Sequence, residues 1–525
     1  MAEKFYVTTP IYYPNDIPHI GHAYTTLAAD VLSRWNSLQG KEVFFLTGTD
    51  DHGKKIANTA KEKGLSPQEF TDKLVPKFKD AWKNLNIKYD RFIRTTDKDH
   101  EKIVGEVLQK CYDKGDIYKG EYEGLYCTGC EAYFTEKDLE DGKCPIHKKP
   151  VEKLKEETYF FKLSEYKDKL LDFYKKNPKF LSPKNRSKEI INRVSEGLND
   201  LSISRASFDW GIPLPFDKEH VTYVWFDALF NYYSATRKKG KEKFWPADVH
   251  LIGKDISWFH TVYWPAFLIS AGIELPKVVY SHGWWTFDKE KISKSRGKIL
   301  HVDKLIKIAG VDSARYFLFR EASFGEDGDF SEQALIDRHN NELANKLGNL
   351  ISRVSSLAEK YGIEKVKDRP LDKKWKKVLE GGEATYEEMV GSIGSNDEGR
   401  VIRFLEIKHG GGSDALLLSY PQVLNEVTQY FVKKHMESFQ IDKALATIFS
   451  FIDGCNEFIQ LRKPWESSKK LEYRRYVLGE AVRAIREITT LLSPFIPETS
   501  EKISKIFKTD KIKKSPIIFK KIEVQ

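Results

Sequence analysis

The chain has 525 residues, of which 40% are hydrophobic and 31% are charged. This balance is typical of a soluble globular protein with roughly two to four domains. No run of about 18 apolar residues occurs, which excludes a membrane-spanning helix. The first residues lead into a strand pattern without a signal peptide's apolar stretch, so we expect a cytosolic (cytoplasmic) protein. The formal net charge of +9 fits a polyanionic partner, but many proteins that bind no nucleic acid share it.

The first 50 residues read as a strand, a helix and a second strand. Residues 5–9 (FYVTT) form a short apolar run, and apolar residues then recur with a helical period from Gly21 until Gly40. The segment "EVFFLTGTDDHG" is an apolar strand followed by an acidic loop. A strand–helix–strand unit predicts a parallel sheet, which binds ligands at the carboxyl ends of its strands.

The remaining pattern predicts a sheet that is split by an insertion. Residues 55–116 are mostly amphipathic helix, and residues 117–222 combine short strands, a cysteine cluster and many lysines. The strand-then-loop pattern returns in three segments, 220–233, 248–256 and 277–287, and beyond about residue 330 the pattern is helical. A glycine-rich segment, 381–418, interrupts the helical part and reads as an inserted surface loop, although "RVIRFLEI" within it is compatible with a strand.

The stretch "PNDIPHIGHAY", residues 14–24, lies where the first strand turns into the first helix. Unpaired backbone N–H groups and the helix dipole make such a helix start a site for phosphate. Gly21 allows close approach, and His19 and His22 could donate hydrogen bonds to phosphate oxygens. The alternative is an ordinary loop that happens to contain two histidines.

A second basic stretch is "KISKSRGK", residues 291–298. A loop that carries Lys291 and Lys294 among serines and a glycine could clamp a triphosphate. Taken alone, such a basic run is more often a solvated surface.

The chain has five cysteines, an odd number, and three of them are clustered, which favours a metal site over disulfides. The pattern C-x2-C-x13-C-x2-H suits one tetrahedral zinc, and four ligands leave no open position, which indicates a structural site. The other two cysteines have no such spacing and are expected to be ordinary buried thiols. The four candidate ligands are Cys127, Cys130, Cys144 and His147.

"HIGH" near the start and "KISKS" after the second half of the split sheet resemble the two signatures of class I aminoacyl-tRNA synthetases. Further stretches resemble the methionyl-tRNA synthetase family over nearly the whole chain. These are "TTPIYYPNDIPHIGHAY", "FLTGTDDHG", "RFIRTTD", "EGLYCTGCEAY", "VWFDAL", "LIGKDISWFH", "HGWWTFDKEKISKSRG", "NKLGNLISR" and "RKPW".

The resemblance and the patterns together predict an α/β fold: a split Rossmann-like parallel sheet with an inserted zinc-knuckle domain, followed by an α-helical bundle. We divide the chain accordingly. The first half of the catalytic domain is 1–116, the inserted connective domain 117–222 (zinc knuckle 127–147), the second catalytic half 223–290, the KISKS loop and stem-contact region 291–345, and the anticodon-binding bundle 346–525.

The resemblance implies a methionine-binding site. Asp50, at a strand end, would pair with the ammonium group of the amino acid. An apolar and aromatic wall would surround the thioether, although Leu229 stands where some family members have proline. The implied wall residues are Ile11, Tyr13, Trp225, Ala228, Leu229, Tyr232, Ile256, His260 and Trp264.

It also implies an ATP site. Asp255 would bond the ribose hydroxyls, next to Gly253, and His282, Gly283 and Trp284 would form the adenosine-binding block. His19, Gly21, His22 and Lys294 complete this set. Ile292 replaces the methionine of the usual "KMSKS" form and leaves both lysines in place.

Anticodon recognition is the third implied site. Asn349 and Arg353 lie four residues apart and share one helix face, and Trp465 follows a helix. By resemblance they read the CAU anticodon of tRNA(Met), with bases stacked on the tryptophan and bonded by the polar side chains. Without the upstream motifs, a solvated helix face and a core aromatic would be the simpler interpretations.

The resemblance predicts a methionine–tRNA ligase that uses Mg-ATP and one structural zinc, with His19, His22, Lys291 and Lys294 stabilising charge during adenylation. No further RNA-binding, dimerising domain is visible after "RKPW", so we expect a monomer. The alternatives are a synthetase for isoleucine, valine or leucine, which usually carries a larger insertion, a cysteinyl enzyme, a small nucleotidylyltransferase and a non-catalytic RNA-binding relative.

Overall fold

The computed structural model describes residues 3–127, 132–134, 136, 139–145, 148–287, 290–291, 300–365 and 420–523. It divides into two compact units. The first comprises residues 1–286, 290–303 and 325–327, and the second comprises 287–289, 304–324 and 328–525. The predicted glycine-rich insertion at 381–418 lies outside the described residues.

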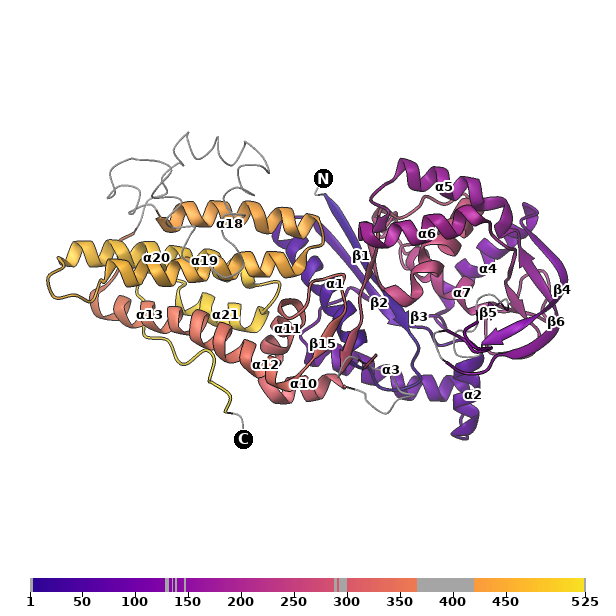
Figure 1. The fold of residues 1–525 in the computed structure, drawn as a ribbon, viewed down its shortest axis with the longest axis horizontal. Coiled ribbons are helices and arrows are strands. Elements are labelled where there is room, and N and C mark those ends of the chain that lie inside the picture. The colour runs from indigo at the N-terminus through magenta and orange to yellow at the C-terminus, as the bar shows by residue number, and fades with distance from the viewer. Residues whose placement is uncertain are drawn as a thin grey trace. The chain divides into compact units, whose positions relative to one another are not determined.

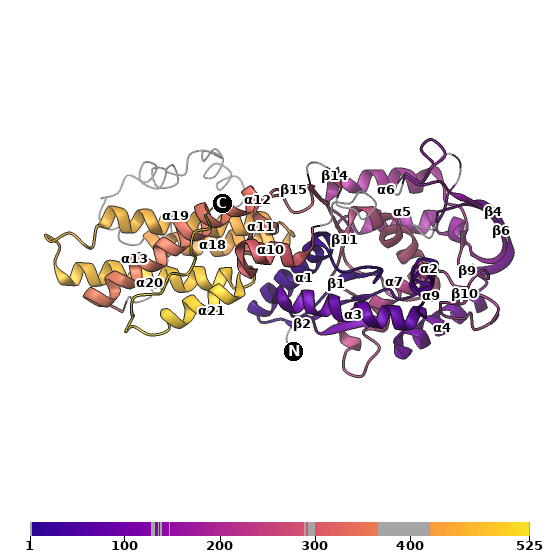
Figure 2. The same cartoon turned by 90° about the horizontal axis from the view of Figure 1, so that it is seen from below.

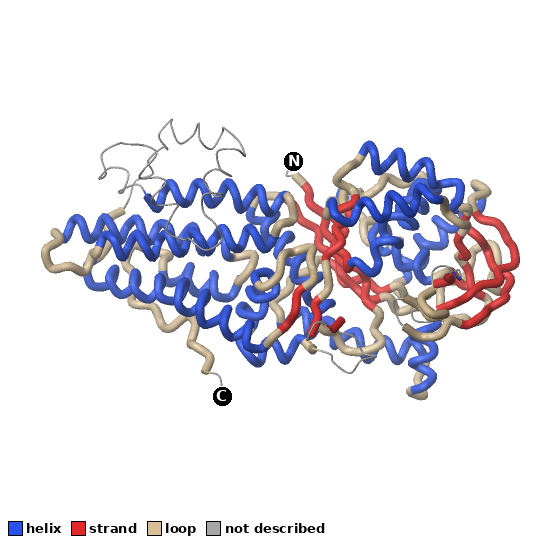
Figure 3. The backbone as a smooth tube through the Cα atoms, in the orientation of Figure 1, coloured by secondary structure: helices blue, strands red, loops and turns tan. Residues whose placement is uncertain are grey.

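The first unit is built on a six-stranded sheet with the strand order β3-β2-β1-β11-β12-β7 (Figures 1 and 3). Every neighbouring pair in this sheet is parallel, as predicted. The six strands are β1 (Lys4–Tyr12), β2 (Glu42–Thr49), β3 (Arg91–Arg94), β7 (Leu181–Ser182), β11 (Val249–Gly253) and β12 (Val279–His282).

The helices of this unit connect and cover the strands. The first helix packs on β1, β2 and β11 and is buried along most of its length, because its apolar residues recur all round it. The helices are α1 (Ile20–Leu38), α2 (Lys54–Glu62), α3 (Pro67–Asn84), α4 (Lys98–Asp113), α5 (Lys167–Lys176), α6 (Lys184–Glu196), α7 (Val224–Leu229), α8 (Asn231–Ser234) and α9 (Trp264–Ala271).

Within the predicted insertion, a second, antiparallel sheet has the order β5-β4-β6-β8. Its long hairpin pairs Ile117 with Phe161, and Figure 2 shows the curved β4 and β6 strands beside each other. The strands within the insertion, apart from β7, are β4 (Ile117–Cys127), β5 (Ala132–Phe134), β6 (Glu152–Phe161), β8 (Leu201–Ser202), β9 (Ser204–Arg205) and β10 (Val221–Thr222). Two short strands follow the main sheet, β13 (Trp285–Phe287) and β14 (Glu290–Lys291).

Three elements differ from the sequence prediction. The range 55–116, expected to be mostly helix, also contains β3 of the main sheet. The edge strand β7 comes from the range expected to be the insertion. The segment 220–233, expected to follow the strand-then-loop pattern, has only the two-residue β10 and then α7 and α8, because its aromatic residues enter the main apolar core as helix.

The second unit is mainly helical, as predicted. Helices α13, α18, α19 and α20 pack on one another, and α19 buries apolar residues such as Ile448 and Phe451. Among the described residues of the whole chain, no helix is both long and apolar enough to cross a membrane. The elements are α10 (Val302–Ala309), α11 (Val311–Arg320), β15 (Gly328–Phe330), α12 (Glu332–Arg338), α13 (Asn349–Tyr361), α18 (Tyr420–Glu437), α19 (Ile441–Arg462), α20 (Leu471–Leu492) and α21 (Pro497–Ile506).

A glycine in β2 tests how closely the main sheet is packed. A Cβ atom at Gly48 would lie 1.9 Å from the Ile93 carbonyl oxygen of β3, whereas a Cβ at Gly105 in α4 meets no atom within 4 Å. We expect Gly48→Ala to destabilise the fold by about 1–3 kcal/mol and Gly105→Ala to stabilise it by roughly 0.5–1 kcal/mol. Urea unfolding of the two variants measures both signs. Equal effects would contradict the close approach of β2 and β3.

Candidate functional site

His19 and His22 form a capping box at the start of α1. The Nδ1 atom of His19 accepts a hydrogen bond from the Gly21 N–H at 3.1 Å, and the Nδ1 atom of His22 accepts one from the His19 N–H at 3.3 Å. The two rings stack with their centroids 3.8 Å apart. A Cβ at Gly21 would lie 3.0 Å from the His19 ring, so the glycine makes room for it.

These bonds fix the proton positions of the two histidines. A nitrogen that accepts a backbone N–H carries no proton, so the proton of each neutral ring sits on Nε2. Both rings are therefore hydrogen-bond donors through Nε2–H at a helix start, a place that favours anions.

Asp50 directly follows β2 and is buried. Its backbone N–H donates to the Tyr12 carbonyl at 2.9 Å, across the paired ends of β1 and β2. Burial raises the pKa of Tyr232, and the Asp50 charge adds to the rise. The Asp50 carboxylate is therefore electrostatically coupled to this residue of the predicted wall.

Part of the predicted methionine wall is joined by hydrogen bonds. Burial lowers the pKa of His260 to about 4, so its ring is neutral at pH 7. Its Nδ1–H donates to the Ile256 carbonyl at 3.0 Å, which leaves Nε2 to accept from the Tyr232 hydroxyl at 2.7 Å. The proton positions of both side chains are thereby set.

The other wall residues fall into two groups. Ile11, Tyr13 and Trp225 are partly buried against the core, and the Trp225 ring stacks on Phe259 with centroids 3.9 Å apart. Ala228, Leu229 and Trp264 are buried. Trp264 has 0% exposure and its Nε1–H donates to His250, so it belongs to the core that underlies the predicted wall.

The predicted ATP residues follow β11 and β12. Asp255 accepts a hydrogen bond from the Trp284 indole N–H at 3.0 Å, and a Cβ at Gly253 would lie 2.7 Å from the Asp255 carboxylate. A Cβ at Gly283 would lie 2.3 Å from the Glu326 backbone, so the glycine is sterically required. Asp327, which the sequence did not single out, accepts from the Trp284 backbone N–H at 2.8 Å.

His282 is held as a neutral ring between two partners. Burial lowers its pKa to about 4. Its Nδ1–H donates to the Gly283 carbonyl at 2.7 Å, so its Nε2 accepts from the Thr25 hydroxyl at 2.7 Å. Both ring nitrogens are used within the protein, so His282 supports the segment that was predicted to bind adenosine.

A buried network of His52, Asp227, His100 and Ser234 was missed by the sequence analysis. The Asp227 carboxylate lies 2.6 Å from His52 Nδ1 and 2.7 Å from His100 Nε2, and His100 Nδ1 lies 2.8 Å from the Ser234 hydroxyl. The network links the Asp50 loop to α4, α7 and α8. The signal that could have found it is the position of His52 in "TDDHG".

Burial alone would disfavour the charged forms of Asp227 and His52, but the attraction between the two side chains outweighs this effect of burial. Despite desolvation, the two histidines hold the pKa of Asp227 below its usual value, and the Asp227 carboxylate holds the pKa of His52 above its usual value. The pair is therefore an ion pair at mildly acidic pH.

Four predicted residues are not placed in full. Lys294, Cys130 and His147 lie outside the described residues, and Lys291 lies on β14 without a described side chain. Cys127 and Cys144 are buried, and Cys144 sits in a tight turn in which its carbonyl accepts from the Lys148 N–H at 2.8 Å. Cys111 and Cys455 are buried thiols, as predicted.

The predicted anticodon residues come together in the second unit. Asn349 and Arg353 are exposed on α13, and the Arg353 guanidinium carbon lies 5.9 Å from the Trp465 ring centroid. Arg353 also donates to the Gln460 side chain at 3.4 Å. Trp465 is 38% exposed.

Comparison with known families gives the class of the protein. Residues 5–153 and 134–355 match the family model described as tRNA synthetases class I (M), and residues 423–522 match the anticodon-binding domain of tRNA ligases. The protein is thus a class I tRNA synthetase.

Individual relatives are more specific. The chain is 45% identical to the methionine–tRNA ligase of Caldanaerobacter subterraneus, over 96% of this chain and 74% of that protein. It is 44% identical to the methionine–tRNA ligase of Clostridium tetani, over 97% and 74%. A crystal structure of Mycobacterium tuberculosis methionyl-tRNA synthetase bound by methionyl-adenylate matches with a TM-score of 0.83 and 36% identity, over 96% of this chain and 94% of that one. The chain belongs to the methionine–tRNA ligase family.

The Asp227 network predicts a pH-dependent stability. The attraction between Asp227 and protonated His52 is fully present between about pH 4 and 6.5. It is lost as the pH rises through the elevated pKa of His52, and also as the pH falls through the lowered pKa of Asp227. We expect Asp227→Asn to lower the free energy of unfolding by about 3 kcal/mol at pH 5.5 and by less at pH 9.

Urea unfolding at the two pH values measures this difference. Asp99→Asn is a matched control, because Asp99 pairs with Arg91, whose charge is constant over this range. An equal loss at both pH values for Asp227→Asn would contradict a charged His52.

Proposed function

We propose that the protein activates methionine with ATP to methionyl-adenylate and transfers the methionyl group to the 3′ end of tRNA(Met), with the residues predicted from the sequence in the following roles. One observation carries the proposal. The neighbouring strands β2, β1, β11 and β12 are all parallel, so the predicted ligand-binding residues that follow each of them gather at one edge of the sheet. They are Asp50 after β2, Tyr13 after β1, Asp255 after β11 and Gly283 after β12.

Methionine binds beside this edge. The buried Asp50 carboxylate pairs with the ammonium group, and the wall around Tyr232 and His260 surrounds the thioether. Because His260 is neutral and donates to Ile256, no ionised imidazole faces the sulfur. The Tyr232 hydroxyl is directed to His260, which leaves the tyrosine ring as the apolar surface.

Adenylation then needs positioning and charge stabilisation. The methionine carboxylate oxygen attacks the α-phosphorus of Mg-ATP, the bond to the β-phosphate oxygen breaks, and pyrophosphate leaves. The Nε2–H groups of His19 and His22, with Lys291 and Lys294, stabilise the charge on the phosphates. The methionine carboxylate is already ionised, so no protein base is required.

Transfer to tRNA completes the reaction. A hydroxyl of the terminal adenosine attacks the carbonyl carbon of the adenylate, and AMP leaves. The exposed Trp465 indole stacks a base of the CAU anticodon, and Asn349 and Arg353 bond base edges.

One structural zinc completes the inserted domain. The buried Cys127 and Cys144, at the end of β4 and in a tight turn, are compatible with thiolate ligands, and Cys130 and His147 supply the other two. No group of three potential ligands occurs among the described residues, and two of the four proposed ligands lie outside them. Bound zinc would hold the knuckle together. Metal analysis of the purified protein, with Cys144→Ser as the comparison, tests this.

The proposed division of the chain follows the same roles: 1–116 and 223–290 bind substrates, 117–222 carries the zinc knuckle, 291–345 holds the KISKS loop and stem-contact region, and 346–525 reads the anticodon. The monomeric state stays a prediction, which light scattering on the eluting protein measures.

The function is tested by amino-acid-dependent ATP–pyrophosphate exchange and by tRNA charging. We expect exchange with methionine and not with leucine, isoleucine, valine or cysteine. Trp465→Ala should lower charging of tRNA(Met) by about 5- to 150-fold, because a base–aromatic stack is worth about 1–3 kcal/mol, and should leave exchange unchanged. Exchange with a different amino acid would overturn the assignment of the methionine wall. Equal loss of both activities would place Trp465 in the fold of the bundle.

Two variants of His19 separate its role as a helix cap from its role as a hydrogen-bond donor to phosphate. His19→Asn keeps an acceptor near the position of Nδ1, and so the helix cap, but removes the Nε2–H donor. We expect it to lower the exchange rate about 100-fold with little change in stability. His19→Gln keeps a donor near Nε2 and loses the cap, so it should cost about 1 kcal/mol of stability and retain more exchange.

Exchange assays and urea unfolding on both variants measure the two effects. The opposite ranking, with the Asn variant active and the Gln variant inactive, would mean that His19 acts only through the helix cap.

A further inference from the structure

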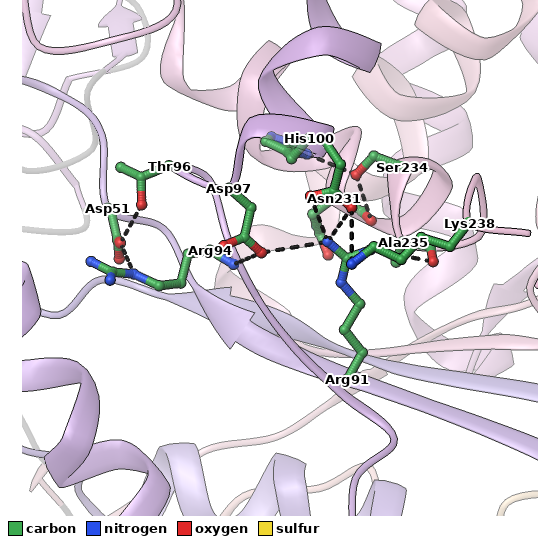
Figure 4. A network of polar contacts seen from close by, with 11 residues as sticks. Asp51, Arg91, Arg94, Thr96, Asp97, His100, Asn231, Ser234, Ala235 and Lys238 are labelled. Carbon is green, nitrogen blue, oxygen red and sulfur yellow. Dashed lines mark hydrogen bonds and ion pairs between the residues drawn. The ribbon is translucent and has the colours of Figure 1, made fainter.

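A second carboxylate, Asp51, directly follows the proposed ammonium ligand and has its own buried cation. The Asp51 side chain has 0% exposure, and its Oδ2 accepts from Arg94 Nε at 2.5 Å and from the Thr96 hydroxyl at 3.1 Å. Arg94 in turn donates to Asp72 of α3 at 2.6 Å and to Thr71 at 3.1 Å. Figure 4 shows Arg94 reaching Asp51 and Thr96 beyond it.

The backbone around Asp50 and Asp51 is fixed on both sides. The Asp50 N–H donates to Tyr12 of β1, and the Asp51 N–H donates to the Thr95 hydroxyl at 2.9 Å. The Asp51 carbonyl accepts from the Trp210 indole N–H at 2.6 Å. The two carboxylates have different surroundings: Asp51 bonds Arg94, whereas Asp50 is coupled to Tyr232. Fixing Asp51 therefore restricts where the preceding carboxylate, Asp50, can point.

The positive charge of Arg94 is a second reason for its pairing with Asp51. Two adjacent buried carboxylates disfavour each other's ionised form. Burial raises the pKa of Asp51, and Arg94 opposes that rise. Arg94 therefore offsets part of the Asp51 charge and weakens the repulsion between Asp51 and Asp50.

Stability alone explains the pair poorly. A buried ion pair adds little net stability compared with well-packed apolar residues of the same volume. The same strand offers a comparison in Arg91, whose side chain is 11% exposed against 19% for Arg94. Arg91 bonds both oxygens of Asp99 on α4 and does not reach the Asp50 loop.

From these contacts we infer that Arg94 and Asp51 are positioning residues for the methionine ammonium: the pair orients Asp50 and weakens the repulsion between the two neighbouring carboxylates. This inference rests on the proposed function, in which Asp50 binds the ammonium group. Neither Arg94 nor Asp51 touches the substrate in this arrangement.

The test is ATP–pyrophosphate exchange by Arg94→Lys, with Arg91→Lys as the matched control. Lysine keeps the charge but not the fork that holds Asp51, Asp72 and Thr71 together. We expect Arg94→Lys to raise KM for methionine about tenfold while KM for ATP stays within about twofold, and Arg91→Lys to change neither. Asp51→Asn keeps an acceptor for Arg94, so it should raise KM for methionine less than Arg94→Lys does.

A substrate analogue isolates the ammonium group. Competition with 4-(methylthio)butanoate, which lacks that group, measures affinity for the rest of the substrate. We expect its inhibition constant to be the same in wild type and Arg94→Lys, because only ammonium recognition is weakened. A rise in KM for both substrates, or an equal loss for the analogue, would overturn the inference.

Two further variants separate the possible failures. Asp50→Asn should raise KM for methionine at least as much as Arg94→Lys; if it does not, the proposed role of Asp50 fails. If Asp50→Asn has this effect and Arg94→Lys has none, only the positioning role fails.

Should Arg94→Lys not fold, Asp72→Asn is the second variant. It removes the charge of the half-exposed Asp72 partner of Arg94, and it should raise KM for methionine by a few-fold. An unchanged KM in that folded variant would also overturn the inference.

Discussion

Strand β1 pairs in parallel with β11, which lies 242 residues further along the chain. Side chains reinforce this pairing. The Tyr6 N–H donates to Asp248 at 2.7 Å, and Thr8 Oγ1 lies 2.7 Å from His250 Nδ1. Burial holds the pKa of His250 well below its usual value, and its Nε2 accepts from Trp264, so Nδ1–H donates to Thr8. The proposed phosphate and methionine residues of the first half meet the ribose-binding residues of the second only because this pair forms.

Buried histidines are used in two electrostatic states around that pairing. His250, His260 and His282 are neutral, with each ring nitrogen assigned to a protein partner, so they fix geometry without adding charge. His52 instead shares Asp227 with His100 and is held toward its charged form. The neutral rings lie where apolar methionine and the adenosine are proposed to bind, and the charged one supports the acidic loop that would hold an ammonium group.

The sequence predicted the parts of the fold that have strong periodicity or a motif. The β1–α1–β2 unit follows from two short apolar runs, which are buried almost continuously, and from helical spacing between them, and the "HIGH" loop falls at the helix start as expected. Strands β3 and β7 have four and two residues, too few for a pattern. The segment "VWFDAL" has strand-forming residues but is helix α7, since burial in the core decides over local preference. Asp227 lies within "VWFDAL", but nothing in that stretch points to a partner, and only the folded chain brings Asp227 and His100 to His52.

The two capping boxes of the first unit show why the histidines of α1 point to chemistry. Helix α3 begins with Ser66 and Glu69, the residues that stability prefers for a capping box. Helix α1 makes the same pair of backbone bonds with His19 and His22, which are not the preferred caps. A sequence that departs from local preference at one helix start and follows it at another indicates a requirement beyond folding. Serine and glutamate would cap α1 equally well but would not place two Nε2–H donors at its positive end, where the triphosphate is proposed to bind.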